Sequence, residues 1–169
     1  MRRVALLRGI NVGGKAKVPM ADLKKVLEGA GATKVATYIR SGNVVFDGPT
    51  SLNAKVLERA IEKHFKLNVA VAVRSKAQMQ ALAKANPYPD TDFVHVAFLF
   101  GKPKKTNLDR IDADDFAPEA FTVKAEDMFV YLPNGVGTSK FLPYIGRRIG
   151  VEMTVRNWRT VTKLCEMLG

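Results

Sequence analysis

The sequence is short of cysteine, histidine and long apolar runs, and each shortage excludes a class of protein. Its single cysteine, Cys165, rules out an internal disulfide and favours a reducing, cytoplasmic setting. No apolar run approaches the roughly 20 residues of a membrane helix, and the one after the basic start ends at Arg8, too early for a secretory signal. The two histidines, His64 and His95, belong to no metal-ligand or nucleophile–base pattern. We therefore expect no membrane association, no metal and no cofactor.

Acidic residues are also scarce. The chain has 16 Asp and Glu against 27 Lys and Arg, a net charge of +11 with a pI near 9.9. Such an excess favours anionic partners such as nucleic acid, phosphorylated metabolites or acidic surfaces, although a basic surface that contacts only water has the same composition. The excess lies toward the chain ends, since residues 1–40 hold nine basic and two acidic residues while residues 101–135 hold five and seven.

The first half alternates strand-like and helix-like segments. Apolar runs bounded by turn residues predict strands, and a 3.6-residue apolar period predicts helices. Pro19 suits the first position of a helix, and Ser75 with Gln78 forms a capping box. The predicted strands are 3–8, 35–40, 43–47 and 69–74, and the predicted helices are 19–31, 52–65 and one that begins after Ser75. This β-α-β-β-α-β order is that of the ferredoxin-like, split β-α-β arrangement.

The second half resembles the first. Residues 4–9 (VALLRG) are similar to residues 96–101 (VAFLFG), and residues 73–75 (VRS) are similar to residues 155–157 (VRN). Between them we predict an acidic helical piece at 108–116, strands at 120–124 and 128–132, and a helix at 138–149. The predicted fold class is α+β, with duplicated ferredoxin-like halves whose antiparallel sheets are flanked by helices. The halves are 1–86 and 91–169, on either side of the break NPYPD, packed as one compact unit.

A glycine-rich loop follows the first predicted strand, in the segment LLRGINVGGKAKVP at residues 6–19. Gly9, Gly14 and Lys15 match the spacing of a nucleotide-binding P-loop, but Ala16 stands where that loop needs Ser or Thr to hold magnesium. Pro19 also delays the helix start, and a hairpin-containing order is not that of a parallel nucleotide-binding sheet. A P-loop is therefore rejected.

The remaining interpretations of this loop are a flexible connection or an anion site. Connections between a strand and a helix ordinarily take about 2–6 residues, and this one runs from residue 9 to 18. A long loop with glycines, Asn11, Lys15 and Lys17 can direct backbone N–H and ammonium groups at an anion. We therefore predict that it binds one.

Three further polar clusters are candidates for the same site: the turn RSGN at 40–43, the loop GTSK at 137–140 and the pair RN at 156–157. Turn geometry and helix capping are the alternative explanations for each of them. In a ferredoxin-like sheet the first and third strands are antiparallel neighbours, which brings the first loop close to the turn. The candidate ligand-binding residues are Arg8, Asn11, Gly13, Gly14, Lys15, Lys17, Arg40, Ser41, Asn43, Gly137, Ser139, Lys140, Arg156 and Asn157, and no catalytic residue is predicted.

Four ordered blocks, LLRGINVGGKAKVPM, YIRSGNVVF, PNGVGTSKF and TVRNWRTVTKL, together resemble a bacterial family, domain of unknown function sixteen-ninety-seven. The resemblance covers essentially the whole chain and implies an α+β fold with ferredoxin-like halves. It implies no activity. Two positions depart from the pattern expected of that family: Arg40 replaces a more usual glutamine, and Phe141 a leucine. The first departure changes the charge of the candidate site.

Three functions agree with these features. The preferred one is a cytoplasmic protein with a site for an anionic small molecule carrying phosphate or carboxylate, and whether it is an enzyme stays open. The alternative is a nucleic-acid-binding protein, although the first predicted strand lacks the stacking aromatic residues of RNA-recognition sheets and the third has only Phe46. The last is an interaction module, for which the sequence fixes no oligomeric state.

Overall fold

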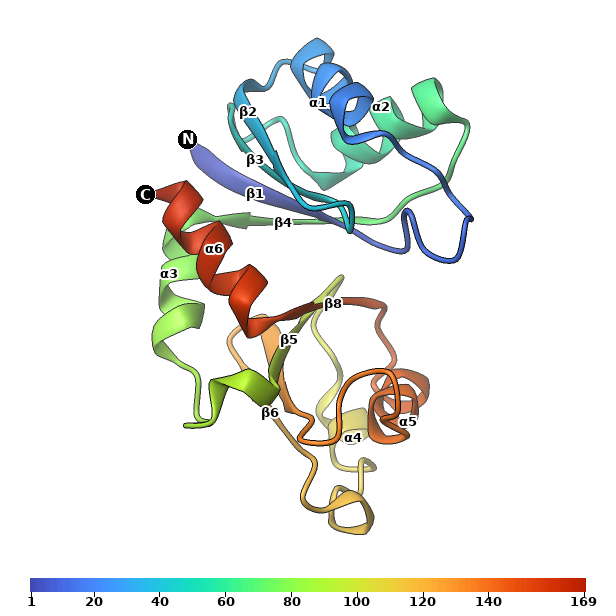
Figure 1. The fold of residues 1–169 in the computed structure, drawn as a ribbon, viewed down its shortest axis with the longest axis vertical. Coiled ribbons are helices and arrows are strands. Elements are labelled where there is room, and N and C mark those ends of the chain that lie inside the picture. Colours follow the sequence, from blue (N-terminus) through green and yellow to red (C-terminus); the bar gives the residue numbers. More distant parts are fainter. The chain divides into compact units, whose positions relative to one another are not determined.

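Two four-stranded antiparallel sheets organise the chain (Figure 1). The computed structural model describes residues 1–169, which divide into unit 1, Met1–Gln80 with Lys163–Gly169, and unit 2, Ala81–Thr162. Helices flank each sheet, so the predicted α+β fold with two similar halves is confirmed. The packing of residues 1–86 and 91–169 as one compact body stays a prediction.

Unit 1 is built around a central strand, β1 (Arg2–Leu7), which is buried along nearly its whole length. Its sheet has the order β2-β3-β1-β4 with every pair antiparallel, the ferredoxin-like arrangement. Two helices lie side by side on one face (Figure 1) and cover a core that includes Leu7, Leu27 and Ile61. The other elements of this half are α1 (Met20–Gly29), β2 (Thr33–Tyr38), β3 (Asn43–Asp47), α2 (Ala54–Phe65), β4 (Val71–Ser75) and α3 (Lys76–Lys84).

Unit 2 repeats this plan with the sheet order β6-β7-β5-β8. One face of the sheet packs against an aromatic cluster in which Phe116 stacks on Phe141 at 4.9 Å between ring centroids and lies 4.6 Å from Tyr144. The elements of this half are β5 (Val94–Leu99), α4 (Lys105–Leu108), β6 (Ala120–Lys124), β7 (Asp127–Tyr131), α5 (Phe141–Arg148) and β8 (Met153–Asn157), with short 3₁₀ turns at Thr91–Phe93 and Asp114–Phe116. α6 (Trp158–Leu168) follows β8, and its residues from Lys163 onward belong to unit 1.

The strand registers show that the sequence repeat is a structural repeat. Val4 pairs with Arg74 in unit 1, and the corresponding Val96 pairs with Arg156 in unit 2. In both halves the arginine Nη1 donates a hydrogen bond to the carbonyl of the preceding valine, at 3.1 Å from Arg74 and 3.0 Å from Arg156. The two pairs of similar sequence segments therefore contain the same cross-strand pair in each sheet.

Helix caps follow the predicted residues at two strand ends. Ser75 Oγ accepts from the Gln78 amide at 3.1 Å while Gln78 Oε1 accepts from the Ser75 amide at 2.7 Å, which is the expected capping box. Asn157 Oδ1 accepts from the Thr160 amide at 2.8 Å and caps α6. At the start of α1, Pro19 is the N-cap and not the first helical residue as predicted.

The predicted acidic helix at 108–116 is wrong in extent. α4 (Lys105–Leu108) ends at the first residue of the predicted helix, and beyond it the segment contains only a 3₁₀ turn at Asp114–Phe116. Asp112 explains the break, because its carboxylate accepts a hydrogen bond from the Asp114 amide at 3.1 Å and so replaces a helical backbone bond. None of the helices combines the length and the apolar character needed to cross a bilayer.

Candidate functional site

The glycine-rich loop of unit 1 is an ordered miniature hairpin. The Lys15 amide donates to the Val12 carbonyl at 3.0 Å, and the Asn11 amide donates to the Ala16 carbonyl at 3.0 Å. Between them Gly13 and Gly14 have φ angles of +57° and +73°, as the two central residues of a type I′ turn require. The glycines are therefore needed for a tight turn, and the loop has a defined shape.

Asn11 fixes this hairpin to the rest of unit 1. Its Nδ2 donates to the Val18 carbonyl at 2.9 Å and to the Arg40 carbonyl at 2.8 Å, while its Oδ1 accepts from the Val18 amide at 2.8 Å. The side chain thus joins both ends of its own loop and also the turn between β2 and β3. Both amide hydrogens are used inside the protein, so the contribution of Asn11 to a site is to position the loop.

The turn between β2 and β3 is longer than predicted. β2 ends at Tyr38 and not at residue 40, so the connection spans four residues, 39–42. Asn43 causes this early end, because its buried Nδ2 donates to the Tyr38 carbonyl at 2.9 Å and to Ser41 Oγ at 3.0 Å. The Leu7 amide donates to the Gly42 carbonyl at 2.8 Å, which places the turn beside the end of β1 as expected.

Four cationic side chains belong to the glycine-rich loop and to the turn between β2 and β3 that Asn11 connects to it. Arg8, Lys15, Lys17 and Arg40 are all exposed. Lys15, Lys17 and Arg40 form no ion pair. The backbone amides of Gly13 and Gly14 make no hydrogen bond within the protein. We call residues 8–17 together with Arg40 the cationic loop. It concentrates positive charge on a backbone whose shape is fixed by Asn11.

The predicted residues of the loop before α5 have mainly structural contacts. Ser139 Oγ accepts from the Leu142 amide at 3.1 Å and donates to Glu119 Oε2 at 3.0 Å. Ser139 is therefore a helix cap that already faces a carboxylate, which would repel an added anion. Gly137 and Lys140 are exposed beside it.

Arg156 is buried, and it forms hydrogen bonds within its own strand. Its Nη1 donates to Thr154 Oγ1 at 2.8 Å and to the Val155 carbonyl, and burial lowers the pKa of Arg156 to about 10. The guanidinium keeps its charge at neutral pH. The matching arrangement at Arg74 supports a structural role for both arginines.

The candidate residues thus form two groups. Nine belong to unit 1, where the structure brings Arg8, Asn11, Arg40, Ser41 and Asn43 together at one end of the sheet. The other five belong to unit 2. Convergence of the two groups on one ligand stays a prediction, as do the individual ligand roles.

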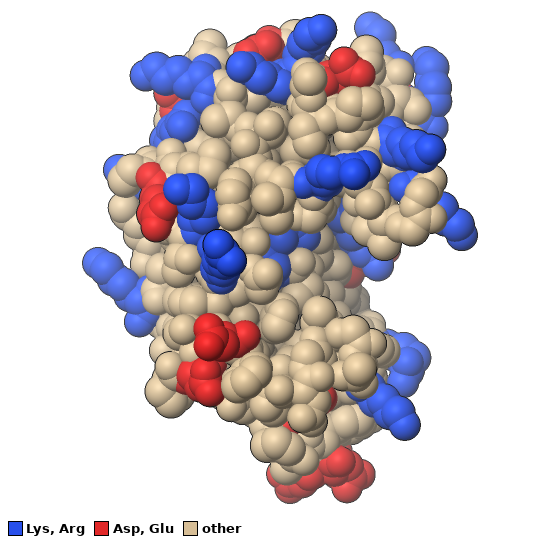
Figure 2. Space-filling model, in the orientation of Figure 1, with Lys and Arg blue, Asp and Glu red and all other residues tan.

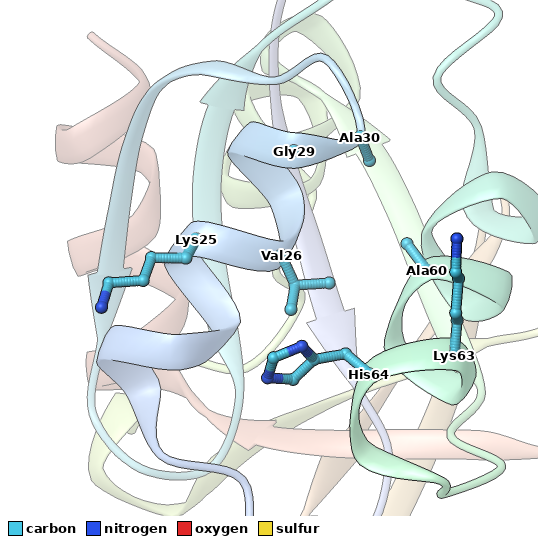
Figure 3. Close-up of a pocket in the computed structure, with 7 residues that line it drawn as sticks. All are labelled: Lys25, Val26, Gly29, Ala30, Ala60, Lys63 and His64. Carbon is cyan, nitrogen blue, oxygen red and sulfur yellow. The ribbon is translucent and has the colours of Figure 1, made fainter.

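A hollow between α1 and α2 was not predicted from the sequence (Figure 3). It has a volume of about 490 Å³ and is lined by Lys25, Val26, Gly29, Ala30, Ala60, Lys63 and His64. Small residues at facing positions of two helices leave this space open, and the repeated Ala and Gly at the contact are the signal that could have revealed it. No group of three or more His, Cys, Asp or Glu side chains is placed to hold a metal ion.

The net charge is divided unequally between the units. Unit 1 has 16 Lys and Arg against six Asp and Glu, whereas unit 2 has 11 against ten. Ten of the eleven excess positive charges therefore belong to unit 1. Figure 2 shows Lys and Arg outnumbering carboxylates on the visible surface of α1 and α2.

His95 gives a prediction for pH dependence. Its Nδ1 is buried without a hydrogen-bond partner, and burial lowers the pKa of His95 below 6.5. The unfolded chain therefore binds a proton at His95 at a higher pH than the folded chain does. The contribution of neutral His95 to the free energy of unfolding is fully present above pH 6.5, and it is lost as the pH falls from there through the folded-state pKa. Urea denaturation at pH 7.5, 6.5 and 5.5 should show this loss in the native chain and a flatter profile in His95→Leu. Equal slopes for the two would refute the assignment to His95.

Comparison with known proteins gives a family and a fold. The sequence model of the family described as "Protein of unknown function (DUF1697)" matches residues 1–129. The solved structure of the conserved bacterial protein SP0830 from Streptococcus pneumoniae is similar with a TM-score of 0.75 and 25% sequence identity, over 99% of this chain and 98% of that one. No curated protein has a significant match to the chain. Neither of the two descriptions names an activity.

Proposed function

Because the chain belongs to the DUF1697 family, whose description gives no activity, we propose from its own geometry that unit 1 binds an anionic small molecule at the cationic loop. The observation that carries this proposal is the fixing of the loop by Asn11, whose three hydrogen bonds join residues 11, 18 and 40. A loop whose shape is set before binding loses less conformational entropy when a ligand arrives. Phosphate and carboxylate are the groups that ammonium, guanidinium and backbone N–H donors recognise.

The cations around the loop supply the affinity. Lys15, Lys17 and Arg40 have no acidic partner to displace, and Gly13 and Gly14 offer amides that are not used elsewhere. Exposed ion pairs each contribute only about 0.2–1 kcal/mol, so inorganic phosphate alone should bind with a dissociation constant on the order of millimolar. The proposal assigns recognition to these residues, because no histidine or carboxylate of the loop itself can act as a general base.

Amide chemical shifts test this proposal. Titration with inorganic phosphate, against sodium chloride of the same ionic strength, should move the amides of Gly13 and Gly14 and saturate. Lys15→Ala with Lys17→Ala should abolish saturation. The matched control, Lys102→Ala with Lys104→Ala, removes two exposed and unpaired lysines of unit 2 and should change nothing. Shifts that are absent, or that survive loss of both loop lysines, would refute the site.

Arg40 offers a separate test of the turn. Asn11 is bonded to the Arg40 carbonyl and not to its side chain, so Arg40→Gln should keep the loop in place. Loss of one exposed cation is expected to weaken phosphate binding about two- to fivefold. An unchanged dissociation constant would remove Arg40 from the site while leaving the lysines in it.

A further inference from the structure

A second positively charged surface of unit 1 lies on its helices, apart from the cationic loop. Lys55, Arg59 and Lys63 follow one another at intervals of four residues along α2, so they lie on one side of that helix about 6 Å apart. Lys66 at the end of α2 and Lys25 on α1 complete the set, and all five are exposed. We call these five residues the helical face.

The charges of the helical face are available to a partner. None of its five cations forms an ion pair, whereas the neighbouring Lys24 lies 3.9 Å from Glu28. Glu58, the acid nearest in sequence to Arg59, accepts a hydrogen bond from the Val71 amide at 2.9 Å. Glu62 is the one exposed carboxylate among the cations of α2. The surface therefore keeps a strong net positive charge.

The hollow between the helices lets a ligand approach this charge closely. Figure 3 shows Lys25 extending from α1 and Lys63 from α2, with the His64 ring beside Val26 between the two helices. Gly29, Ala30 and Ala60 leave this region open because they carry almost no side chain. The phosphate groups of a polyanion can thus come close to cations on both helices.

The composition of the helical face indicates which class of partner it fits. The exposed large hydrophobic residues of the protein are Met1, Val12, Ile39 and Val136, and none belongs to α1 or α2. A helix that lies on a membrane inserts large apolar side chains, and the core of a protein interface is rich in aromatic and apolar residues. The helical face has neither, which leaves the phosphate backbone of a nucleic acid as the partner that its chemistry fits.

We propose that the helical face of unit 1 binds duplex nucleic acid through backbone phosphates, without selecting sequence. Selection of sequence needs side chains that reach base edges or aromatic rings on which bases stack. α1 carries no aromatic residue, and in α2 Phe65 is half-buried and has His64 edge-on at 4.6 Å. Lysine and arginine spaced along a helix give charge without base recognition. This proposal concerns other residues than the cationic loop and does not depend on it.

Salt dependence provides the measurement. Five phosphate contacts predict that the logarithm of the association constant falls with the logarithm of salt concentration at a slope of about −4.5. Fluorescence anisotropy with a mixed-sequence 20-base-pair DNA in 50–300 mM KCl measures this slope. The triple variant Lys55→Ala, Arg59→Ala, Lys63→Ala should reduce it to about −2 and weaken binding at 100 mM KCl at least tenfold.

Three comparisons make the test decisive. Two control variants should bind DNA as tightly as the native chain does. One is Lys24→Ala, which removes the lysine of α1 that is paired with Glu28, and the other is the unit 2 double variant Lys102→Ala, Lys104→Ala. Duplexes of unrelated sequence should bind within about twofold of one another. The proposal is overturned by no binding at 50 mM KCl, by a triple variant with native affinity, or by vesicles containing phosphatidylserine that bind more tightly than DNA. Circular dichroism confirms that the surface variants are folded.

Discussion

Gly42→Ala is expected to lower the free energy of unfolding by about 3 kcal/mol, which makes it one of the two most damaging single substitutions that we predict. Gly42 lies in the turn that joins β2 to β3 and has a φ angle of +90°. A Cβ atom there would lie 2.8 Å from Leu7 Cβ and 2.8 Å from Ile10 Cδ1. Both neighbours are buried, so they cannot move into solvent to make room.

Two costs add at this position. An alanine at positive φ costs roughly 1–2 kcal/mol, and overpacking of a filled core costs roughly 1–3 kcal/mol. Urea denaturation followed by circular dichroism measures their sum, and the melting temperature should fall by roughly 6–12 °C. Because Ile10 belongs to the cationic loop, the substitution should also shift the amides of residues 10–18.

Gly9→Ala is the matched control. Gly9 also has a positive φ, +67°, but nothing lies within 4 Å of the place where a Cβ would stand. This substitution therefore costs only the backbone term of about 1–2 kcal/mol. If Gly42→Ala were no more destabilising than Gly9→Ala, the close packing of Leu7 and Ile10 against the turn would be wrong.

The fold could be predicted from the sequence where local signals agree with the packing. The run VALL of β1 is buried on both sides of the sheet, so it is continuously apolar and easily recognised. The pair Val4 and Arg74 is repeated as Val96 and Arg156, and the repeat can be recognised in the sequence because the same strand register occurs in both sheets. The acidic segment before β6 was mistaken for a helix, because whether an aspartate bonds its own backbone is decided by the surrounding structure.

For the candidate residues of unit 1, the sequence predicts which segments are neighbours but not what each side chain contacts. Antiparallel pairing of β1 with β3 follows from the element order, and it brings residues 8–11 to the turn at 40–43. The sequence could not show that Asn11 donates both amide hydrogens to backbone carbonyls, or that Asn43 donates to one carbonyl and to Ser41 Oγ, since those acceptors depend on the exact loop conformation. An asparagine selected to orient a ligand and one selected to hold a loop look alike in a sequence.

Replacement of Asn11 should separate these two roles. Asn11→Ala is expected to destabilise the protein by about 3 kcal/mol, because three hydrogen bonds of about 1 kcal/mol each, two of them partly buried and one exposed, are lost or left to water. Asn11→Gly removes the same bonds but accepts the φ angle of +56° more easily, so it should be about 1 kcal/mol less damaging. The difference between the two variants isolates the backbone contribution.

The functional effect of these variants bears on the proposed anion site. Asn11→Gly keeps Lys15, Lys17 and Arg40, yet it frees the loop, so phosphate should lose at least tenfold in affinity and the Val18 amide should exchange faster with solvent. Asn53→Ala is the control, since it removes an exposed cap bond of 3.2 Å to the Val56 amide at a cost of about 1 kcal/mol and leaves the loop untouched. Native phosphate affinity in Asn11→Gly would mean that charge alone binds the anion, because the ordering of the loop by Asn11 would then contribute nothing.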